Sequence, residues 1–315
     1  MRVLLVDCDP QCNSTQLVLG QSVCERLYYK ATDDVNRDTI LKMLKPILDG
    51  DSSIDRSVTV FSGKENRFGV DLIAGHPQLS VLEDMLSDAW GKLTAGHIEG
   101  FRRNHWSGSL VSEMEQRGYD LVLFDVGPSL GSLNRSVLIG SECFVTPMGC
   151  DIFSIVGIRN IASWLTSWLA NYKTGWDLCE SKRSGTLASY SIGRSLSIEQ
   201  GFVGYTVQQY ITKARGGVRR PTLAYESIMQ DIPGEVAKNL GAFSRGVLSD
   251  RLKLGDVPHL YSLVPLAQLA NAPIMGLGSG DDLVGSQYSQ ARKFGDIIEG
   301  VASKLGANLG IEVAE

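Results

Sequence analysis

Short apolar runs alternate along the chain with longer segments that have an apolar residue every three or four positions. The short runs are typical of buried strands, and the longer segments are typical of amphipathic helices. Strands are predicted at residues 2–7, 70–74, 120–126, 142–147, 202–207 and 259–264. Helices are predicted at residues 36–48, 79–90, 109–117, 131–140, 152–171, 222–240 and 285–305. Because continuous apolar strands that alternate with helices favour a parallel sheet covered on both faces, we expect an α/β fold.

The pattern reveals no boundary between domains. Residues 1–315 are therefore interpreted as one domain. Residues 174–201 are rich in Ser, Gly and charged residues, which indicates a flexible insertion. Trp164 and Trp168 lie one turn apart on the helix predicted at 152–171, where helix packing explains them better than ligand binding.

Composition excludes several classes of protein. The chain has 315 residues, 43% of them hydrophobic, and a net charge of −5, so neither global disorder nor a globally basic nucleic-acid binder is expected. It has no run of 18 apolar residues and no signal peptide, which predicts a cytoplasmic protein without a membrane segment. The six cysteines form no CxxC pair and the four histidines show no ligand spacing, so we expect reduced thiols and no zinc site.

Acidic residues stand at the ends of two predicted strands. Asp7 and Asp9 end the first strand, and Asp125 ends the strand at 120–126. The carboxyl ends of parallel strands are where α/β sheets place ligands, and carboxylates are hard oxygen ligands that suit Mg²⁺. The alternatives are a helix cap at Asp125 and a pair of solvated acids at Asp7 and Asp9.

Several segments resemble the ParA/MinD/Soj family of deviant-Walker ATPases, in the same order. VLLVDCDPQCNST at 3–15 resembles the family's VLLIDxDPQGNxT, and YDLVLFDVGPSLGSLNRSVL at 119–138 resembles its Walker B segment. VDLIAGHPQLSVLE at 70–83 and ECFVTPMGCDIFSIVGIRNI at 142–161 are also similar to family segments. The resemblance implies a doubly wound, mostly parallel sheet with helices on both faces, and ATP with Mg²⁺ as cofactors.

The resemblance also implies roles for individual residues. Asp9 would orient or activate the attacking water, Asp7 would lie near the Mg²⁺ shell, and Asp125 would be the Walker B acid. Two switch loops are implied, formed by Asn13, Ser14 and Thr15 and by Gly127, Pro128 and Ser129. The chain departs from the family in both loops, because Cys12 replaces a glycine and Gly127 replaces a proline.

The family's phosphate-binding loop is missing from the sequence. Members begin with a strand followed by KGGxGKT[ST], whose backbone N–H groups and lysines cradle the phosphates. No GxxxxGK[ST] occurs among the 315 residues. The first strand and its loop could be encoded upstream, could come from another chain, or could be lost in a rearranged pseudo-ATPase. We expect an upstream segment, because Met1-Arg2 stands where members often have Gly-Met-Arg.

Two other motifs suggest competing chemistry. Gly127 to Gly131 matches G-x-S-x-G, so Ser129 with His259 and Asp250 or Asp256 could form a hydrolase triad. No HGGG-type segment accompanies it, and the family resemblance explains Ser129 without a nucleophile. The glycines of MGLGSGDD at 275–282 precede two aspartates, which would repel phosphate, so a surface loop is favoured.

A group of basic residues stands at 211–221. It comprises Lys213, Arg215, Arg219 and Arg220. Related partition ATPases bind DNA nonspecifically through basic residues in their C-terminal half, and a solvated loop is the alternative.

The resemblance implies a protein for partition or positioning of DNA or other cargo. It further implies a homodimer, nonspecific DNA binding and a centromere-binding, ParB-like partner. ATP hydrolysis is not expected of a chain without the phosphate loop. The alternative is a non-hydrolysing pseudo-ATPase that acts as an interaction or regulatory protein.

Overall fold

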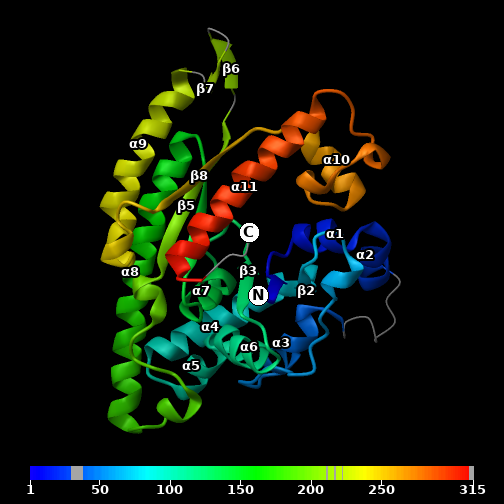
Figure 1. The fold of residues 1–315 in the computed structure, drawn as a ribbon. Coiled ribbons are helices and arrows are strands. Elements are labelled where there is room, and N and C mark those ends of the chain that lie inside the picture. The colour runs from blue at the N-terminus through cyan, green and yellow to red at the C-terminus, as the bar shows by residue number, and fades with distance from the viewer. Residues whose placement is uncertain (30–37, 211, 216–217, 222, 312–315) are drawn as a thin grey trace. The chain divides into compact units, whose positions relative to one another are not determined.

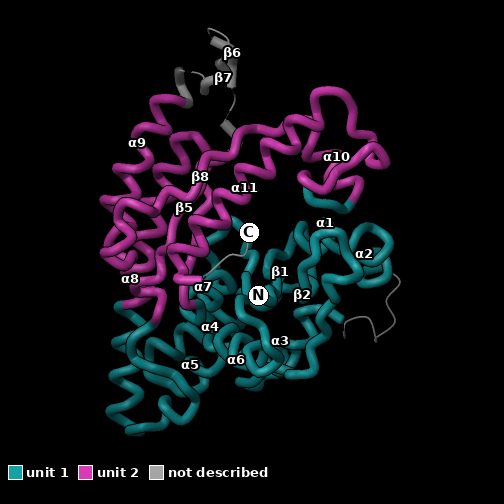
Figure 2. Tube along the Cα trace, in the orientation of Figure 1, with its two compact units in different colours: residues 1–141, 170–196, 271–273 teal, residues 142–169, 197–270, 274–315 magenta. Residues whose placement is uncertain are grey.

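A computed structural model shows the fold of the chain (Figure 1). It describes residues 1–29, 38–210, 212–215, 218–221 and 223–311. Contacts divide the chain into two compact units, which Figure 2 shows in different colours. Unit 1 comprises residues 1–141, 170–196 and 271–273, and unit 2 comprises residues 142–169, 197–270 and 274–315. The assignment of 1–315 to one domain stays a prediction.

The sheet of unit 1 has three parallel strands in the order β2–β1–β3. β1 (Val3–Asp7) lies in the middle, between β2 (Asp71–Ile73) and β3 (Leu121–Asp125). Leu4 and Val6 of β1 are fully buried, as expected for the central strand of a covered sheet.

Helices connect successive strands of this sheet, as parallel pairing requires. The helices of unit 1 are α1 (Asn13–Leu19), α2 (Gln21–Tyr28), α3 (Ile40–Leu48), α4 (Leu82–Thr94), α5 (Ile98–Asn104), α6 (Trp106–Gln116) and α7 (Ser132–Ile139). α3 illustrates why they form, because Ile40, Met43, Leu44 and Ile47 are spaced by three or four positions or adjoin, and all are at most 1% exposed. These side chains join β1, α4, α6 and α7 in one apolar core.

Unit 2 contains a second parallel sheet, in the order β4–β5–β8. Its strands are β4 (Phe144–Gly149), β5 (Phe202–Tyr210) and β8 (Lys253–Pro258). Its helices are α8 (Ile152–Lys182), which continues into unit 1, α9 (Leu223–Leu240), α10 (Leu263–Ala270) and α11 (Gln287–Leu309). β6 (Thr212–Arg215) and β7 (Val218–Pro221) form an antiparallel pair. The Asn308 amide fixes α11 by donating to the Val203 carbonyl at 2.8 Å and the Arg251 carbonyl at 3.1 Å.

Each sheet ends in an open strand. Within the described residues, β3 pairs with β1 alone and β4 pairs with β5 alone. Leu123 of β3 is 41% exposed and Val145 of β4 is 38% exposed. Apolar side chains of parallel strands are normally covered on both faces. β3 is thus an open edge of unit 1, and β4 is an open edge of unit 2.

The structure confirms the α/β fold with mostly parallel strands. Strands lie within or across five of the six predicted segments, but the strand predicted at 259–264 is wrong. β8 ends at Pro258 and α10 begins at Leu263, with Pro265 in its first turn, where a missing N–H is tolerated. The sequence analysis missed β8 because Gly255 and Asp256 interrupt its apolar pattern.

Other boundaries differ from the sequence predictions. α8 extends to Lys182, and short 3₁₀ helices form at Ala188–Tyr190 and Ser197–Gln200, so residues 174–201 are partly regular. The flexibility predicted for that segment stays a prediction. Residues 36, 37 and 222, at the ends of two predicted helices, lie outside the described residues. In the described part of the chain, no helix combines the length and the apolar character that crossing a bilayer requires.

Candidate functional site

The parallel pairing of β1 with β3 brings two of the predicted site residues together. Asp7 and Asp125 are register partners at the carboxyl ends of these strands. The N–H of Cys8, the residue after β1, donates to the Asp125 carbonyl at 2.8 Å. We name this end of the unit 1 sheet, with Asp7, Asp9 and Asp125, the acidic edge.

Asp7 is enclosed by hydrogen-bond donors. It has no exposed surface. Its Oδ2 accepts from the Thr15 N–H at 2.8 Å and from the Thr15 hydroxyl at 2.6 Å, and its Oδ1 accepts from the Asp9 N–H at 3.2 Å. Burial raises the pKa of the Asp7 carboxyl, while the hydrogen bonds from Thr15 act to lower it. Asp7 therefore ties the end of β1 to the first turn of α1.

The end of β2 joins the same network. The Gly75 N–H donates to the Thr15 hydroxyl oxygen at 2.8 Å. A Cβ at Gly75 would lie 2.9 Å from the Asp7 carboxyl carbon and 3.1 Å from the Asp7 carbonyl oxygen. Only glycine fits here without displacing Asp7. The sequence analysis did not identify Gly75, although its place directly after a predicted strand was a signal that could have been used.

Asp9 lies in the loop after β1 and is partly exposed. Its carboxylate accepts from the Gln11 N–H at 3.0 Å, and its carbonyl accepts from the Cys12 N–H at 2.8 Å. A Cβ at Gly127 would lie 3.2 Å from Asp9 Oδ1. The loop after β1 thus places its carboxylate beside the loop after β3.

Asn13, Ser14 and Thr15 are the first turn of α1 and not a loop, which differs from the switch loop that the resemblance implied. The Ser14 hydroxyl donates to Asp125 Oδ2. Thr15 is buried against Asp7, whereas Asn13 is exposed. The first turn of α1 therefore offers a hydroxyl to each of the two paired aspartates.

Pro128 and Ser129 form an exposed bend after the partly buried Gly127, and one side-chain amide holds this bend. The Asn134 side chain donates to the Gly127 carbonyl at 2.6 Å and to the Ser129 carbonyl at 2.5 Å. Asn134 is 4% exposed, so a buried side chain holds this exposed bend in place. A polar residue in the first turns of a helix gave no sequence signal for this role.

The same helix is capped from α4. Glu83 accepts from the Ser132 N–H at 2.5 Å and from the Leu133 N–H at 3.2 Å. A carboxylate at a helix N-terminus satisfies donors that have no intrahelical partner. Glu83 thereby sets the start of α7 and, with it, the position of the bend before it.

Cys12 has a left-handed backbone, with φ 53° and ψ 33°, directly before α1. Residues other than glycine adopt this conformation at a cost of about 1–2 kcal/mol, which explains why the resembling family has glycine here. Cys12 is 4% exposed. Burial raises the pKa of its thiol to about 12, so the side chain is a neutral thiol at ordinary pH.

The acidic edge offers oxygen ligands from Asp125, Asp9 and Ser14. Among the described residues, no group of three or more His, Cys, Asp and Glu side chains is arranged to hold a metal ion. Mg²⁺ does not require such a group, because it keeps several waters and binds proteins through one or two carboxylates. The donors present therefore suit a hydrated Mg²⁺ better than zinc.

The competing motifs gain no support from their contacts. Asp256 forms an ion pair with Lys253 at 2.9 Å, and the His259 ring accepts from the Tyr261 N–H at 3.0 Å. The Ser129 hydroxyl oxygen accepts from the Gly131 N–H at 3.4 Å. In the glycine-rich segment, the Gly278 N–H donates to Asp281 at 2.9 Å, so a carboxylate takes the place of a phosphate.

The basic residues at 211–221 lie in the β6–β7 pair. Lys213 is the register partner of Arg220, Ala214 of Arg219 and Arg215 of Val218. Residues 211, 216 and 217 lie outside the described residues, as do the side chains of this pair. The register places all four basic residues within one short hairpin.

Comparisons with known proteins show what this chain is similar to. The family described as an AAA domain matches residues 1–174. Protein DIP2308 from Corynebacterium diphtheriae is 32% identical, with a TM-score of 0.68 over 86% of this chain and 87% of that chain.

Two further similarities are more distant. The ATP complex of a McdA variant from Cyanothece is 11% identical, with a TM-score of 0.57 over 100% of this chain and 87% of that chain, and shows the fold alone. An uncharacterised protein of Methanocaldococcus jannaschii is 24% identical over 156 residues, which are 50% of each protein. The match thus spans about half the length of that curated relative.

Proposed function

The chain belongs to the family described as an AAA domain, and from this premise we propose that, like ParA/MinD-type ATPases, it takes part in the partition or positioning of DNA or other cargo. The observation that carries the proposal is the register pairing of Asp7 with Asp125, with Asp9 in the adjoining loop. In an α/β protein, acids at the carboxyl ends of neighbouring parallel strands are placed where a nucleotide and its metal bind. The Cyanothece relative, which shares the fold, was crystallised with ATP.

We propose different roles for the three acids. Asp125 is partly exposed and has the Ser14 hydroxyl beside it, so it would hold Mg²⁺ directly or through water. Asp7 is buried and its oxygens accept from three donors. It would therefore position α1 and would not bind the metal itself. Mg²⁺ would supply positive charge to phosphate oxygens, and Asp9 would orient the attacking water.

The phosphate cradle is the part that these 315 residues do not provide in recognisable form. The sequence has no GxxxxGK[ST]. The open edge of β3, with Leu123 41% exposed, supports a place for one more parallel strand in unit 1. We therefore propose that hydrolysis of ATP requires a further strand and a phosphate loop beyond the 315 residues of this chain.

A second candidate is a non-hydrolysing interaction protein that keeps the fold. The replacement of family residues at Cys12 and Gly127 favours it, because both lie in loops next to the acids. This candidate predicts that restoring a phosphate loop does not restore turnover.

Phosphate release from Mg²⁺ and ATP separates the two candidates. We expect the 315-residue chain to show no release above that of Asp125→Asn. An engineered chain with a strand and a KGGxGKT loop ahead of Met1 should hydrolyse ATP, and Asp125→Asn should abolish that activity. If the extended chain is inert although folded, the interaction protein is favoured. If the unextended chain hydrolyses ATP in a manner that needs Asp125, the proposed need for a phosphate loop is wrong.

We propose nonspecific DNA as one ligand and the β6–β7 hairpin as its contact. Its four basic residues would neutralise phosphates, so binding should weaken steeply as salt is raised. Arg219→Glu with Arg220→Glu should reduce retention of the chain on duplex DNA at low salt. A double variant that binds DNA as well as the wild type would rule out the hairpin. A homodimer and a ParB-like partner are further proposals that rest on the family alone.

A further inference from the structure

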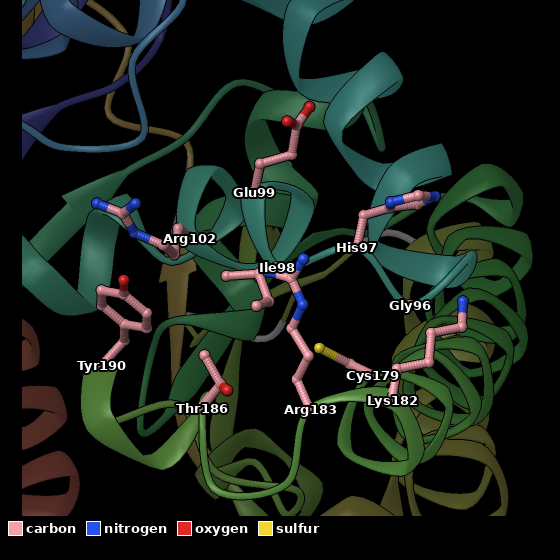
Figure 3. Close-up of a pocket in the computed structure, with 10 residues that line it drawn as sticks. All are labelled: Gly96, His97, Ile98, Glu99, Arg102, Cys179, Lys182, Arg183, Thr186 and Tyr190. Carbon is pink, nitrogen blue, oxygen red and sulfur yellow. The ribbon is translucent and has the colours of Figure 1, made fainter.

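α5, the end of α8 and the turn after α8 line an open cavity of about 630 Å³ in unit 1, shown in Figure 3. Its lining residues are Gly96, His97, Ile98, Glu99, Arg102, Cys179, Lys182, Arg183, Thr186 and Tyr190. None of them belongs to the acidic edge. The volume lies in the range of about 300–1,000 Å³ that small-molecule sites occupy.

The cavity is built on close backbone packing. Gly96 has φ +74°, and a Cβ there would lie 2.8 Å from the Leu178 Cβ, so glycine lets the turn before α5 rest on α8. Glu180 fixes the turn after α8 by accepting from the Gly185 N–H at 2.6 Å and from the Leu187 N–H at 3.3 Å. Both sides of the cavity are therefore anchored by specific contacts.

Three cationic side chains of the lining have no carboxylate partner among the described residues. The Arg102 guanidinium lies 4.5 Å from the centre of the Tyr190 ring, and within the described part of the chain neither Arg102 nor Arg183 forms an ion pair. The Lys182 ammonium donates to the Ala95 carbonyl at 3.5 Å. In Figure 3 the Arg183 side chain extends from the end of α8 toward Ile98 on α5.

The one acid in the lining is engaged by a lysine outside it. Glu99 pairs with Lys92 at 2.6 Å, and Lys92 also contacts Asp88 at 3.1 Å. The cavity therefore carries an excess of positive charge on a chain whose net charge is −5. Like charges that lie close together in a concave site repel one another, and an anion that binds there relieves this repulsion.

We propose that this cavity binds a phosphorylated small molecule. Arg183 and Lys182 would contact the phosphate oxygens, because guanidinium and ammonium groups are the side chains that bind phosphate best. Arg102 keeps its in-plane N–H donors available while its face rests on Tyr190. In Figure 3 it lies on the opposite side of the lining from Lys182, so it would add positive charge to the site without contacting the same phosphate. A pyrophosphate group carries several negative charges and therefore matches this excess of positive charge better than a singly charged anion does.

Calorimetry with inorganic pyrophosphate tests the proposal. The titration is done in EDTA, so that no Mg²⁺ is present and the acidic edge does not contribute. We expect the wild type to bind pyrophosphate and Lys182→Ala with Arg183→Ala to lose at least tenfold in affinity. Glu99→Gln removes the acid and should tighten binding severalfold. The matched control is Arg26→Ala with Lys64→Ala, which makes the same change in net charge at exposed positions of other elements and should bind like the wild type.

Each of the following outcomes overturns the proposal. Pyrophosphate that does not bind the wild type, or that binds the Lys182–Arg183 double variant equally well, excludes the cavity as its site. An equal loss in the Arg26–Lys64 control shows a general effect of charge. Binding of a single-stranded oligonucleotide by the wild type without binding of pyrophosphate assigns the surface to nucleic acid and not to a small molecule. Circular dichroism of both double variants verifies that they fold.

Discussion

β1 and β3 are neighbours in one sheet and both end in an aspartate, yet the two strand ends differ in strand pairing, burial and the number of hydrogen bonds to the aspartate. β1 is paired on both sides and its Asp7 is fully buried. β3 has one partner among the described residues, its Leu123 is 41% exposed, and its Asp125 is partly exposed. Three donors engage the Asp7 carboxylate, whereas the Asp125 carboxylate accepts from the Ser14 hydroxyl.

This difference separates two uses of the same residue type. A carboxylate whose oxygens are all engaged in the protein stabilises the fold and cannot replace water around an ion. A partly exposed carboxylate at an open strand end, with a hydroxyl beside it, can do so. In the proposed function, the end of β1 would therefore stabilise the fold, and the end of β3 would supply the ligand to the metal.

The largest expected effect is the loss of stability in Asp7→Ala. The substitution leaves the Thr15 N–H, the Thr15 hydroxyl and the Asp9 N–H without an acceptor, and we expect a loss of about 3 kcal/mol in the free energy of unfolding. Asp125→Ala should cost less than about 1 kcal/mol. Urea unfolding followed by circular dichroism measures both, and equal losses would contradict the comparison.

A smaller effect is expected at the glycines beside the two ends. Gly75→Ala places a Cβ 2.9 Å from the Asp7 carboxyl carbon, and its cost should be about 2 kcal/mol. Gly127→Ala approaches only the Asp9 carboxylate, at 3.2 Å, and the Asp9 side chain can move aside, so the expected cost is below about 1 kcal/mol. Unfolding in urea is again the measurement. A Gly127→Ala variant that is the less stable of the two would show that the loop after β3 is as closed as the end of β1.

At position 12, the left-handed backbone should affect stability more than the side chain does. Because φ is 53°, Cys12→Gly should be more stable than Cys12→Ala by about 1 kcal/mol. Thermal unfolding of the two variants side by side measures the difference. If alanine is the more stable residue, the left-handed conformation is not what the position requires.

The smallest effect is a dependence of stability on pH. The folded pKa of Asp7 is raised from 3.8 by burial, so the folded chain holds this proton more tightly than the unfolded chain does. The stability difference between the wild type and Asp7→Asn should therefore decrease as pH rises from 3.8 through the folded pKa, and then level off. Unfolding of both proteins in urea at a series of pH values gives this difference. An increase with pH would mean that the hydrogen bonds from Thr15 outweigh burial.

The sequence predicted the acids but not what surrounds them. Strand ends at Asp7 and Asp125 follow from apolar runs that stop at a charge, a local pattern. Gly75 and Glu83 act through contacts with residues distant in the chain, which no local pattern reveals. Asn134 acts on a bend close to it in the sequence, but nothing in the residue types around it indicates that its amide bonds this bend.

The structure differs from the sequence analysis at two further places, for different reasons. Asn13, Ser14 and Thr15 look like a polar loop, yet Asp7 and Asp125 bind the hydroxyls of Thr15 and Ser14 and hold them in a helical turn. The strand predicted at 259–264 had suitable residues, but the prolines at 258 and 265 mark a strand end and a helix start there.

Binding of Mn²⁺, used as a paramagnetic substitute for Mg²⁺, tests the central claim most directly. Electron paramagnetic resonance measures the free ion as protein is added. The account predicts that the wild type binds one Mn²⁺ and that Asp125→Asn loses this binding. Asp120→Asn, the same change at the opposite end of β3, should keep it. Binding that survives Asp125→Asn unchanged would contradict the assignment of ligand chemistry to the end of β3.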